Sequence, residues 1–233
     1  SSAASDVYKR QEKRLRTVTK EILMTQGIPE KDAILATDAL IKADLRGVES
    51  HGVSNMLRAY LGAFKSNSLN PKPNWKIVKE TPSCATINSD NGLGIVVAPQ
   101  AMEIAVEKAK KTGAGIVTMN NCGHLGMLAY HSMIASDNDM IGTTMAACSP
   151  RMVPTYSSVR ALGTNPISYS APADKLPDFV FDAAMTSVAG NKIVLASRLN
   201  VPLSPGWIAD KDGNPIMKEI SIDELNHEDE SKN

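Results

Sequence analysis

The chain has 233 residues, of which 42% are hydrophobic and 21% charged, and its 25 Lys and Arg balance its 25 Asp and Glu. These values predict a globular protein with ample core, and they exclude the basic field on which nucleic-acid binding depends. We therefore expect a small molecule or a second copy of the chain as partner. No apolar run approaches the roughly 20 residues that cross a membrane. The widely spaced Cys84, Cys122 and Cys148 predict reduced thiols in a cytoplasmic setting, with no disulfide framework.

Three helical patterns follow an unpatterned start. Residues 1–11 have no amphipathic period, and we predict that they are an artefact segment outside the fold. The first helix carries apolar side chains from Leu15 onward and ends at Gly27, and the second runs from Pro29 to Asp44. The third has an apolar stripe along one face, formed by Val53, Met56, Leu57, Tyr60, Leu61 and Phe64.

The turn before the third helix combines a cation, a hydroxyl and an imidazole in Arg46, Ser50 and His51. Ser50 is a favoured N-cap residue, so we predict that it caps the third helix and places His51 in the first turn. The partial positive charge of a helix start favours a neutral imidazole and attracts a carboxylate, which the fork of Arg46 can grip. The pattern indicates a proton-transferring His beside an anion site. A surface His at a helix start is an equally compatible alternative.

A proline-rich break at 70–74 predicts a domain boundary. Before it we expect a small helical domain, 12–70, and after it a larger domain, 71–217, followed by a polar tail, 218–233. In the larger part, short β-like segments alternate with helices, which favours an α/β (α+β) fold. The expected strands are 76–79, 84–88, 116–119, 140–146, 167–170 and 179–181; the expected helices are 97–111, one opened by 121–126 that ends near 137, and 187–198.

Two glycine-containing segments invite a nucleotide-binding interpretation. Gly113 and Gly115 lie between a helix and a strand, whereas the Rossmann fingerprint needs a strand, a glycine loop and then a helix, so we reject that motif here. The segment 119–126 has the required order, and the N–H groups of its helix start are placed to receive a pyrophosphate. His124, between two glycines, is a candidate to contact a ribose or nicotinamide. A glycine-rich turn with a capping His explains the same pattern.

Further polar positions lie nearer the C-terminus. Asp182 ends an apolar strand and is either a cap for the following helix or an acceptor for cofactor hydroxyls. Lys192 lies in an apolar helix, where a Lys with a catalytic task and a surface Lys that extends to solvent are both compatible. Thr164 belongs to the turn 163–166. The four histidines show no ligand spacing, so we expect no metal site.

Five segments carry a family resemblance: ADLRGVESHGVSN, GHLGMLAYH, LGTNPIS, DAAMTSVAGNK and PGWIADKDGNP. In this order they resemble the type-2 malate/L-lactate dehydrogenases, a family that also contains ureidoglycolate, sulfolactate and cyclic-imine reductases. The resemblance runs from about Glu12 to Met217. It implies NAD(P)-dependent hydride transfer between a 2-hydroxy acid and its 2-oxo acid, with NAD favoured, and a homodimer. It also implies a non-Rossmann nucleotide-binding domain with a mixed or largely antiparallel sheet flanked by helices.

The resemblance also implies roles for individual residues. His51 would be the acid/base, assisted by Ser50 and Lys192. The residues implied to lie near the substrate are Arg46, Asn55 and Thr164. Those implied to contact the cofactor are His124, Leu125, Gly126, Asp182, Ala183 and Ala184.

The chain departs from the family pattern in three ways. Many members carry Arg at the position of Asn55, and the usual D-M-A-T reads D-A-A-M from Asp182 onward. Members are also longer, so we expect this chain to be a C-terminally truncated fragment. Two alternatives to the dehydrogenase therefore stay open: reduction of a cyclic imino acid by the same residues, and a nucleotide-binding or dimerising module without turnover.

Overall fold

The computed structural model describes residues 2–221 and residue 224, with side chains described from residue 11 onward. Nearly all of the acidic stretch at the end of the predicted polar tail lies outside this description. The chain divides into two compact units. Unit 1 comprises Ser1–Thr144 and Ser168–Asp182, and unit 2 comprises Met145–Ile167 and Ala183–Asn233. The boundary expected at residue 70 lies inside unit 1, and the predicted division into a helical and a nucleotide-binding domain stays a prediction.

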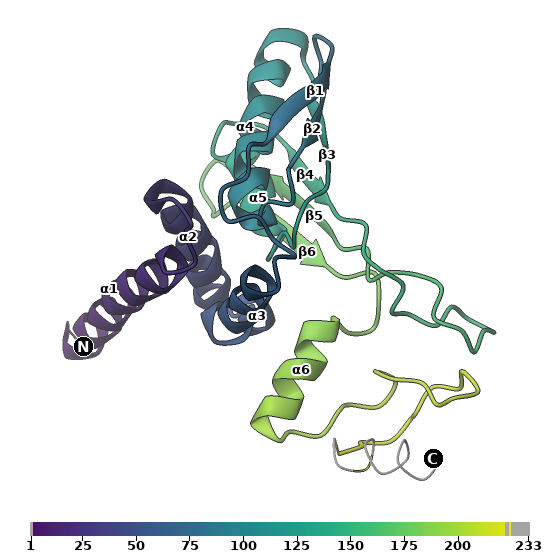
Figure 1. The fold of residues 1–233 in the computed structure, drawn as a ribbon. Coiled ribbons are helices and arrows are strands. Elements are labelled where there is room, and N and C mark those ends of the chain that lie inside the picture. Colours follow the sequence, from purple (N-terminus) through teal and green to yellow (C-terminus); the bar gives the residue numbers. More distant parts are fainter. Residues whose placement is uncertain (1, 222–223, 225–233) are drawn as a thin grey trace. The chain divides into compact units, whose positions relative to one another are not determined.

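Unit 1 opens with the helices α1 (Ser2–Met24), α2 (Glu30–Leu45) and α3 (Val53–Lys65) (Figure 1). The backbone is helical from Ser2, whereas the apolar pattern predicted a start near Leu15. A helix extends more easily than it nucleates, so residues without an apolar stripe can continue one that tertiary contacts hold. The three apolar faces share one core, which contains Leu23, Ala36, Leu40, Met56, Tyr60 and Phe64.

The first sheet of unit 1 contains β1 (Lys76–Glu80), β2 (Cys84–Asn88) and β3 (Ile116–Asn120), in that order. β1 and β2 are antiparallel, and β2 and β3 are parallel. The sheet is therefore mixed, as the family resemblance implied. The helix α4 (Gly94–Thr112) joins the two parallel strands and packs on them through Val97 and Ala101, which meet Ile87.

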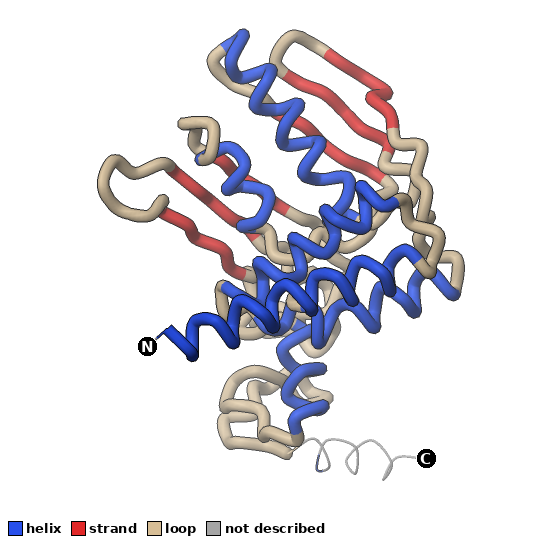
Figure 2. Tube along the Cα trace, turned by 90° about the vertical axis from the view of Figure 1, so that its left-hand side faces the viewer, coloured by secondary structure: helices blue, strands red, loops and turns tan. Residues whose placement is uncertain are grey.

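The second sheet contains β4 (Gly142–Met145), β5 (Ile167–Ala171) and β6 (Phe179–Ala183), again in chain order. Figure 2 shows α5 (Ala129–Ser136) beside these strands. Buried hydroxyls link helix and sheet, because the Ser132 oxygen lies 2.8 Å from that of Ser168 and 2.7 Å from that of Ser170. Ser168 in turn donates to the carbonyl of Phe181, at 2.8 Å.

Unit 2 contains the helix α6 (Gly190–Leu199), which ends where Asn200 takes a left-handed conformation with φ of 53°. Its small core is formed by Ala196, Leu203 and Ile220, against which Trp207 packs. Across residues 2–221, no helix combines the length and apolar character that a membrane span needs. The predicted strands and helices are all found, but several helices begin at other residues than expected, and the changed starts of α3 and α5 alter the candidate site.

Candidate active site

The turn that carries His51 differs from its predicted form. Glu49–His51 forms one 3₁₀ turn, and α3 begins only at Val53. The predicted cap by Ser50 is therefore wrong, and His51 lies before the helix rather than in its first turn. The Val53 N–H donates instead to the carboxylate of Asp44 at 2.9 Å, so a side chain near the end of α2 caps α3.

Two contacts hold this turn. A Cβ atom at Gly52 would overlap the carboxylate of Asp44, so the close approach of the two segments requires glycine. Asn55, only 8% exposed, donates from its side-chain amide to the carbonyl of Ser50 at 2.9 Å. The residue that the resemblance places near the substrate thus also secures the backbone on which His51 stands.

His51 is half-buried, and its Nδ1 lies 2.9 Å from the hydroxyl oxygen of Ser50. Burial lowers the pKa of His51, so the imidazole is mainly neutral at pH 7. A neutral form was predicted from the charge of a helix start, but burial is the cause here. With Nδ1 occupied by a hydroxyl, the other ring nitrogen is the one that can exchange a proton with a ligand.

The segment 121–128 also differs from the prediction. It has no regular secondary structure, and α5 begins at Ala129 rather than at the 124–126 turn. The Ala129 N–H donates to the carboxylate of Asp182 at 2.7 Å, so this donor is not free for the predicted pyrophosphate. Asp182 lies inside β6 and caps α5, not the helix that follows it in the sequence.

Burial of the Asp182 carboxyl outweighs the groups of unit 1 that stabilise its charge. Burial raises the pKa of Asp182, whereas the N–H groups of Ala129 and Leu128 and the positive charge of Arg46 lower it. Arg46 itself is exposed at the C-terminal end of α2. The positive charge of Arg46 therefore acts on a carboxylate of the same unit.

His124 meets His51 ring to ring. The ring centroids are 5.4 Å apart and the ring planes are inclined by 14°, so the two imidazoles are stacked. The Nδ1 atom of His124 accepts a hydrogen bond from the Gly126 N–H at 3.2 Å, and the Tyr60 hydroxyl lies 2.8 Å from the same nitrogen. Because a backbone N–H can only donate, Nδ1 carries no proton. The Tyr60 hydroxyl therefore also donates to it, and Nε2 carries the proton of the neutral ring.

The ring pair disfavours two positive charges. Burial, and after it the charge of His51, lowers the pKa of His124 to about 4. Tyr60 encloses the Nδ1 side of this ring, although the residue His124 as a whole is exposed. Burial also raises the pKa of Tyr60 far above its usual value, so its hydroxyl stays a donor. The pair can thus hold one proton on His51 while His124 stays neutral and offers Nε2–H.

Of the remaining predicted site residues, Leu125 lies in unit 1 and the others belong to unit 2. Thr164 accepts a hydrogen bond through its backbone carbonyl from the Met185 N–H, at 2.8 Å. Ala183 and Ala184 directly follow Asp182. Lys192 is exposed, and its Nζ lies 5.2 Å from the centroid of the Trp207 ring, a cation–π contact. In unit 1, contacts therefore link His51, Ser50, His124, Gly126 and Asn55. Lys192 and Thr164 have their contacts within unit 2.

Two residues near the site were not predicted. Tyr60 was assigned only to the apolar stripe of α3, and His131 was considered only as a metal ligand. A buried Tyr usually has a partner for its hydroxyl, which was the available signal for Tyr60. No local pattern pointed to His131, whose Nε2 lies 2.8 Å from the carbonyl oxygen of Leu125. Among the described residues, no three His, Cys, Asp or Glu side chains are grouped to hold a metal ion.

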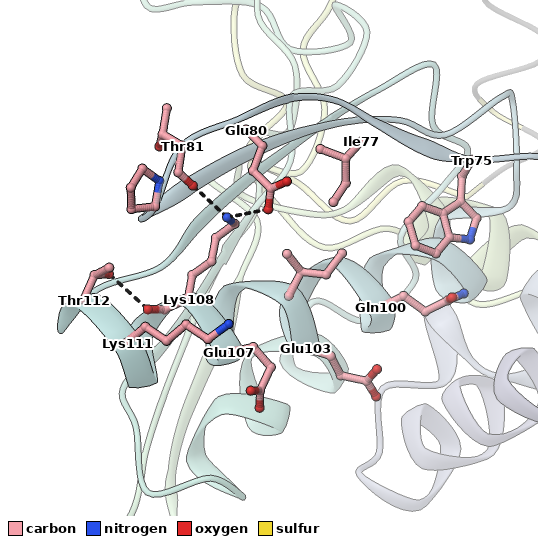
Figure 3. A pocket seen from close by; sticks show the side chains of 12 residues that line it. Trp75, Ile77, Glu80, Thr81, Gln100, Glu103, Glu107, Lys108, Lys111 and Thr112 are labelled. Atoms are coloured by element: carbon pink, nitrogen blue, oxygen red, sulfur yellow. Dashed lines mark hydrogen bonds and ion pairs between the residues drawn. The ribbon is translucent and has the colours of Figure 1, made fainter.

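A cavity of about 810 Å³ lies elsewhere in unit 1, between β1 and α4. Figure 3 shows Lys108 reaching from α4 to the oxygens of Glu80 and Thr81, and Trp75 standing near Gln100. The Lys108 Nζ lies 2.8 Å from each of these oxygens, so its charge is already neutralised. None of the predicted site residues lines this cavity.

Known proteins resemble both the sequence and the fold. The chain is 42% identical over 195 residues to the L-sulfolactate dehydrogenase of Methanocaldococcus jannaschii, covering 84% of this chain and 56% of the relative. It is 39% identical over 205 residues to the malate dehydrogenase of Pyrococcus horikoshii, covering 88% and 56%. The solved sulfolactate dehydrogenase of Methanocaldococcus jannaschii superposes with a TM-score of 0.80 at 38% identity, covering 90% of this chain and 62% of that one.

The chain thus spans a little more than half the length of these relatives. The family model described as malate/L-lactate dehydrogenase matches residues 11–218, which is most of the chain and includes every residue of the candidate site. The match agrees with the five ordered segments, with the mixed sheet and with the absence of a Rossmann glycine loop. The chain belongs to the malate/L-lactate dehydrogenase family.

Proposed function

We propose that the chain is part of an oxidoreductase that transfers a hydride between a nicotinamide cofactor and a 2-hydroxy or 2-oxo carboxylic acid. Sulfolactate and malate, which appear in the names of the relatives, are both 2-hydroxy acids. The observation that carries the proposal is the stacked pair of His51 and His124. A proton-exchanging imidazole stands there against a second imidazole that belongs to the candidate cofactor segment.

His51 is the proposed acid/base. In the reductive direction its protonated ring gives a proton to the 2-oxo oxygen, and in the oxidative direction its neutral ring takes the proton of the 2-hydroxyl. The contact between Ser50 and Nδ1 orients the ring and leaves Nε2 available to exchange the proton with the substrate. Because burial lowers the pKa of His51, the neutral ring prevails at pH 7, and lower pH should favour reduction over oxidation. Lys192 is proposed to assist this exchange.

The residues of the 124–126 segment suit a nicotinamide nucleotide. The carboxamide and phosphate oxygens of such a cofactor accept hydrogen bonds, and His124 is an exposed residue with a proton on Nε2. When bound, the nicotinamide ring supplies or takes up the hydride. We propose contacts to the cofactor, with NAD favoured over NADP, for His124, Leu125, Gly126, Asp182, Ala183 and Ala184.

Arg46 and Thr164 are proposed to lie near the carboxylate of the substrate, since a guanidinium matches a carboxylate with two hydrogen bonds. For Asn55 the buried bond to Ser50 supports an indirect contribution through the His51 turn. A homodimer and a cytoplasmic location complete the proposal. They rest on the family resemblance and on the thiol usage discussed above.

Turnover and binding measurements on the purified chain test the proposal. Oxidation of NADH and of NADPH is followed with pyruvate, with oxaloacetate and with a cyclic ketimine as oxidants. Binding of both cofactors is measured by calorimetry in parallel. We expect binding of NADH and its oxidation by at least one 2-oxo acid.

The other outcomes separate the alternatives. Oxidation only with the ketimine would replace the proposal by cyclic imino acid reduction. Cofactor binding without turnover would assign the chain as a nucleotide-binding module. Absence of both binding and turnover would overturn the proposal for this chain.

A further inference from the structure

His131 is the most deeply buried ionisable side chain near the candidate site. It lies in α5 with 1% of its surface exposed, and the ring of Tyr130 packs edge-on at a centroid distance of 5.5 Å. Its Nε2 lies 2.8 Å from the carbonyl oxygen of Leu125. Because a carbonyl oxygen only accepts, Nε2 carries the proton and donates it to this oxygen. The helix is thereby tied to the irregular segment that precedes it.

The second nitrogen of this ring has no partner. The Nδ1 atom of His131 is buried without a hydrogen bond among the described residues. Burying an unpaired acceptor is unfavourable, and an apolar side chain of similar size would avoid it. A histidine at this position is therefore a poor choice for packing alone, and what distinguishes it from Leu or Phe is the donor at Nε2.

The carbonyl that accepts this donor belongs to a peptide group that also acts on His124. The carbonyl of Leu125 and the N–H of Gly126 are the two ends of one planar peptide unit. His131 donates to the Leu125 oxygen of this peptide at 2.8 Å, and the Gly126 N–H of the same peptide donates to Nδ1 of His124 at 3.2 Å. Gly126 has a positive φ of 67°, a conformation that a free chain would leave easily. Fixing the oxygen of this peptide thus fixes the direction of its N–H.

We propose that His131 is a positioning residue for the candidate active site. By holding the Leu125–Gly126 peptide, it keeps Nδ1 of His124 unprotonated and aims Nε2–H at an acceptor oxygen of the nicotinamide cofactor. The cofactor part of this inference rests on the proposed function, whereas the effect on the His124 ring does not. Tyr60, in α3, donates to the same Nδ1, so the two anchors act together.

Three substitutions at one position test the inference. In His131→Gln the side-chain amide nitrogen can occupy the place of Nε2, so the donor to Leu125 is kept. In His131→Asn the amide nitrogen reaches only the place of Nδ1, and in His131→Leu the donor is absent. Gln is the matched control for Asn, because both replace the ring by a neutral amide.

Nitrogen NMR of the His124 ring is the first readout, because the shifts of Nδ1 and Nε2 report which nitrogen is protonated. We expect the wild-type chain and His131→Gln to show a bare Nδ1. His131→Asn and His131→Leu should show a mixture of the two tautomers and faster exchange of the Gly126 amide hydrogen. Unchanged His124 shifts and Gly126 exchange in both Asn and Leu variants would overturn the inference and leave His131 a core residue.

Binding of NADH and NADPH, measured by calorimetry, is the second readout. The loss of one ordering hydrogen bond should weaken the affinity about three- to tenfold in the Asn and Leu variants and less than threefold in the Gln variant. Equal affinities in wild type, Asn and Gln would contradict the cofactor part. If the wild-type chain binds neither cofactor, the proposed function fails, and the ring spectra still decide whether His131 positions His124. If His131→Leu does not fold, the comparison of Asn with Gln decides.

Discussion

The two turns that meet at the His51–His124 stack are held in opposite ways. The His51 turn is secured by its own neighbours, since Asp44 caps α3 and Asn55 binds the carbonyl of Ser50. The 121–126 turn is secured by His131, six residues beyond Leu125, and from much farther along the chain by Tyr60 and by a close backbone approach at Gly94. The proposed acid/base, His51, thus stands on a support formed within residues 44–55, whereas the candidate cofactor residue His124 also needs contacts from α3 and α4.

The His51 ring is where the comparison predicts the largest effect. His51→Ala should lower the proposed hydride-transfer turnover about 10²- to 10⁴-fold, the usual contribution of a positioned proton donor. Binding of NADH should stay within about threefold of wild type, because the anchors of His124 do not include His51. Steady-state turnover and calorimetric NADH binding of the variant and the wild type check both statements. Near-normal turnover in His51→Ala would remove the acid/base role.

His131, which holds the 121–126 turn, predicts a pH dependence of the free energy of unfolding. Burial lowers the pKa of His131 to about 4 from a usual 6.5. Between these values the unfolded chain binds a proton that the folded chain does not, so stability falls as pH decreases. The contribution is complete above about pH 6.5 and is lost progressively toward pH 4, on the order of 3 kcal/mol in total.

Urea denaturation of wild type and His131→Gln between pH 7 and about pH 4 checks this prediction. The difference between the two proteins isolates His131 from the carboxylates that titrate in the same range. Gln does not titrate, so the variant should lose less stability on acidification. Parallel curves for the two proteins would contradict the assignment.

Gly94, which lets the 121–126 turn approach α4 closely, predicts a smaller change in the free energy of unfolding. A Cβ atom at Gly94 would overlap the carbonyl oxygens of Gly123 and His124, so Gly94→Ala should destabilise the fold by about 1–3 kcal/mol. Gly62→Ala is the matched control, because nothing lies within 4 Å of a Cβ atom there. In the interior of α3 that change should instead stabilise by roughly 0.5–1 kcal/mol. Opposite shifts of the denaturation midpoint are expected; equal shifts would contradict the close approach.

The support of the His51 turn gives the smallest predicted effect. Asn55→Ala removes a buried amide-to-carbonyl hydrogen bond and should destabilise by about 1–2 kcal/mol. Asn138 makes the same kind of bond, to the carbonyl of Ile134, but is exposed, and Asn138→Ala should change stability by less than about 0.5 kcal/mol. Equal losses in the two variants, measured by thermal unfolding, would show that the His51 turn does not depend on Asn55.

Much of this architecture was predictable because it is written in local patterns. The stripe of α3, the break at 70–74 and the strand–helix–strand order around α4 all depend on periodicity and on turn residues. The side-chain set Arg46, Ser50 and His51 was also found, because its members lie within one turn. The failed Rossmann fingerprint at Gly113 and Gly115 was equally a local observation, and the mixed sheet agrees with it.

The wrong starts of α3 and α5 have a common physical reason. A helix N-terminus depends on which acceptor satisfies its free N–H groups, and that acceptor need not be the residue that directly precedes the helix. For α3 it is Asp44 rather than Ser50, and for α5 it is Asp182, which comes from β6. Cap preferences alone could not predict either acceptor.

The sequence by itself thus determined the elements, the family and the residues with the chemistry for proton exchange. Only the tertiary structure decided that His51 stacks on His124 and that Tyr60 and Gly126 set the tautomer of the His124 ring. It also decided that His131 binds the Leu125–Gly126 peptide. Hydrogen bonds of this kind join atoms from α3, α5 and an irregular segment. They depend on distances and angles that exist only once those parts have packed together.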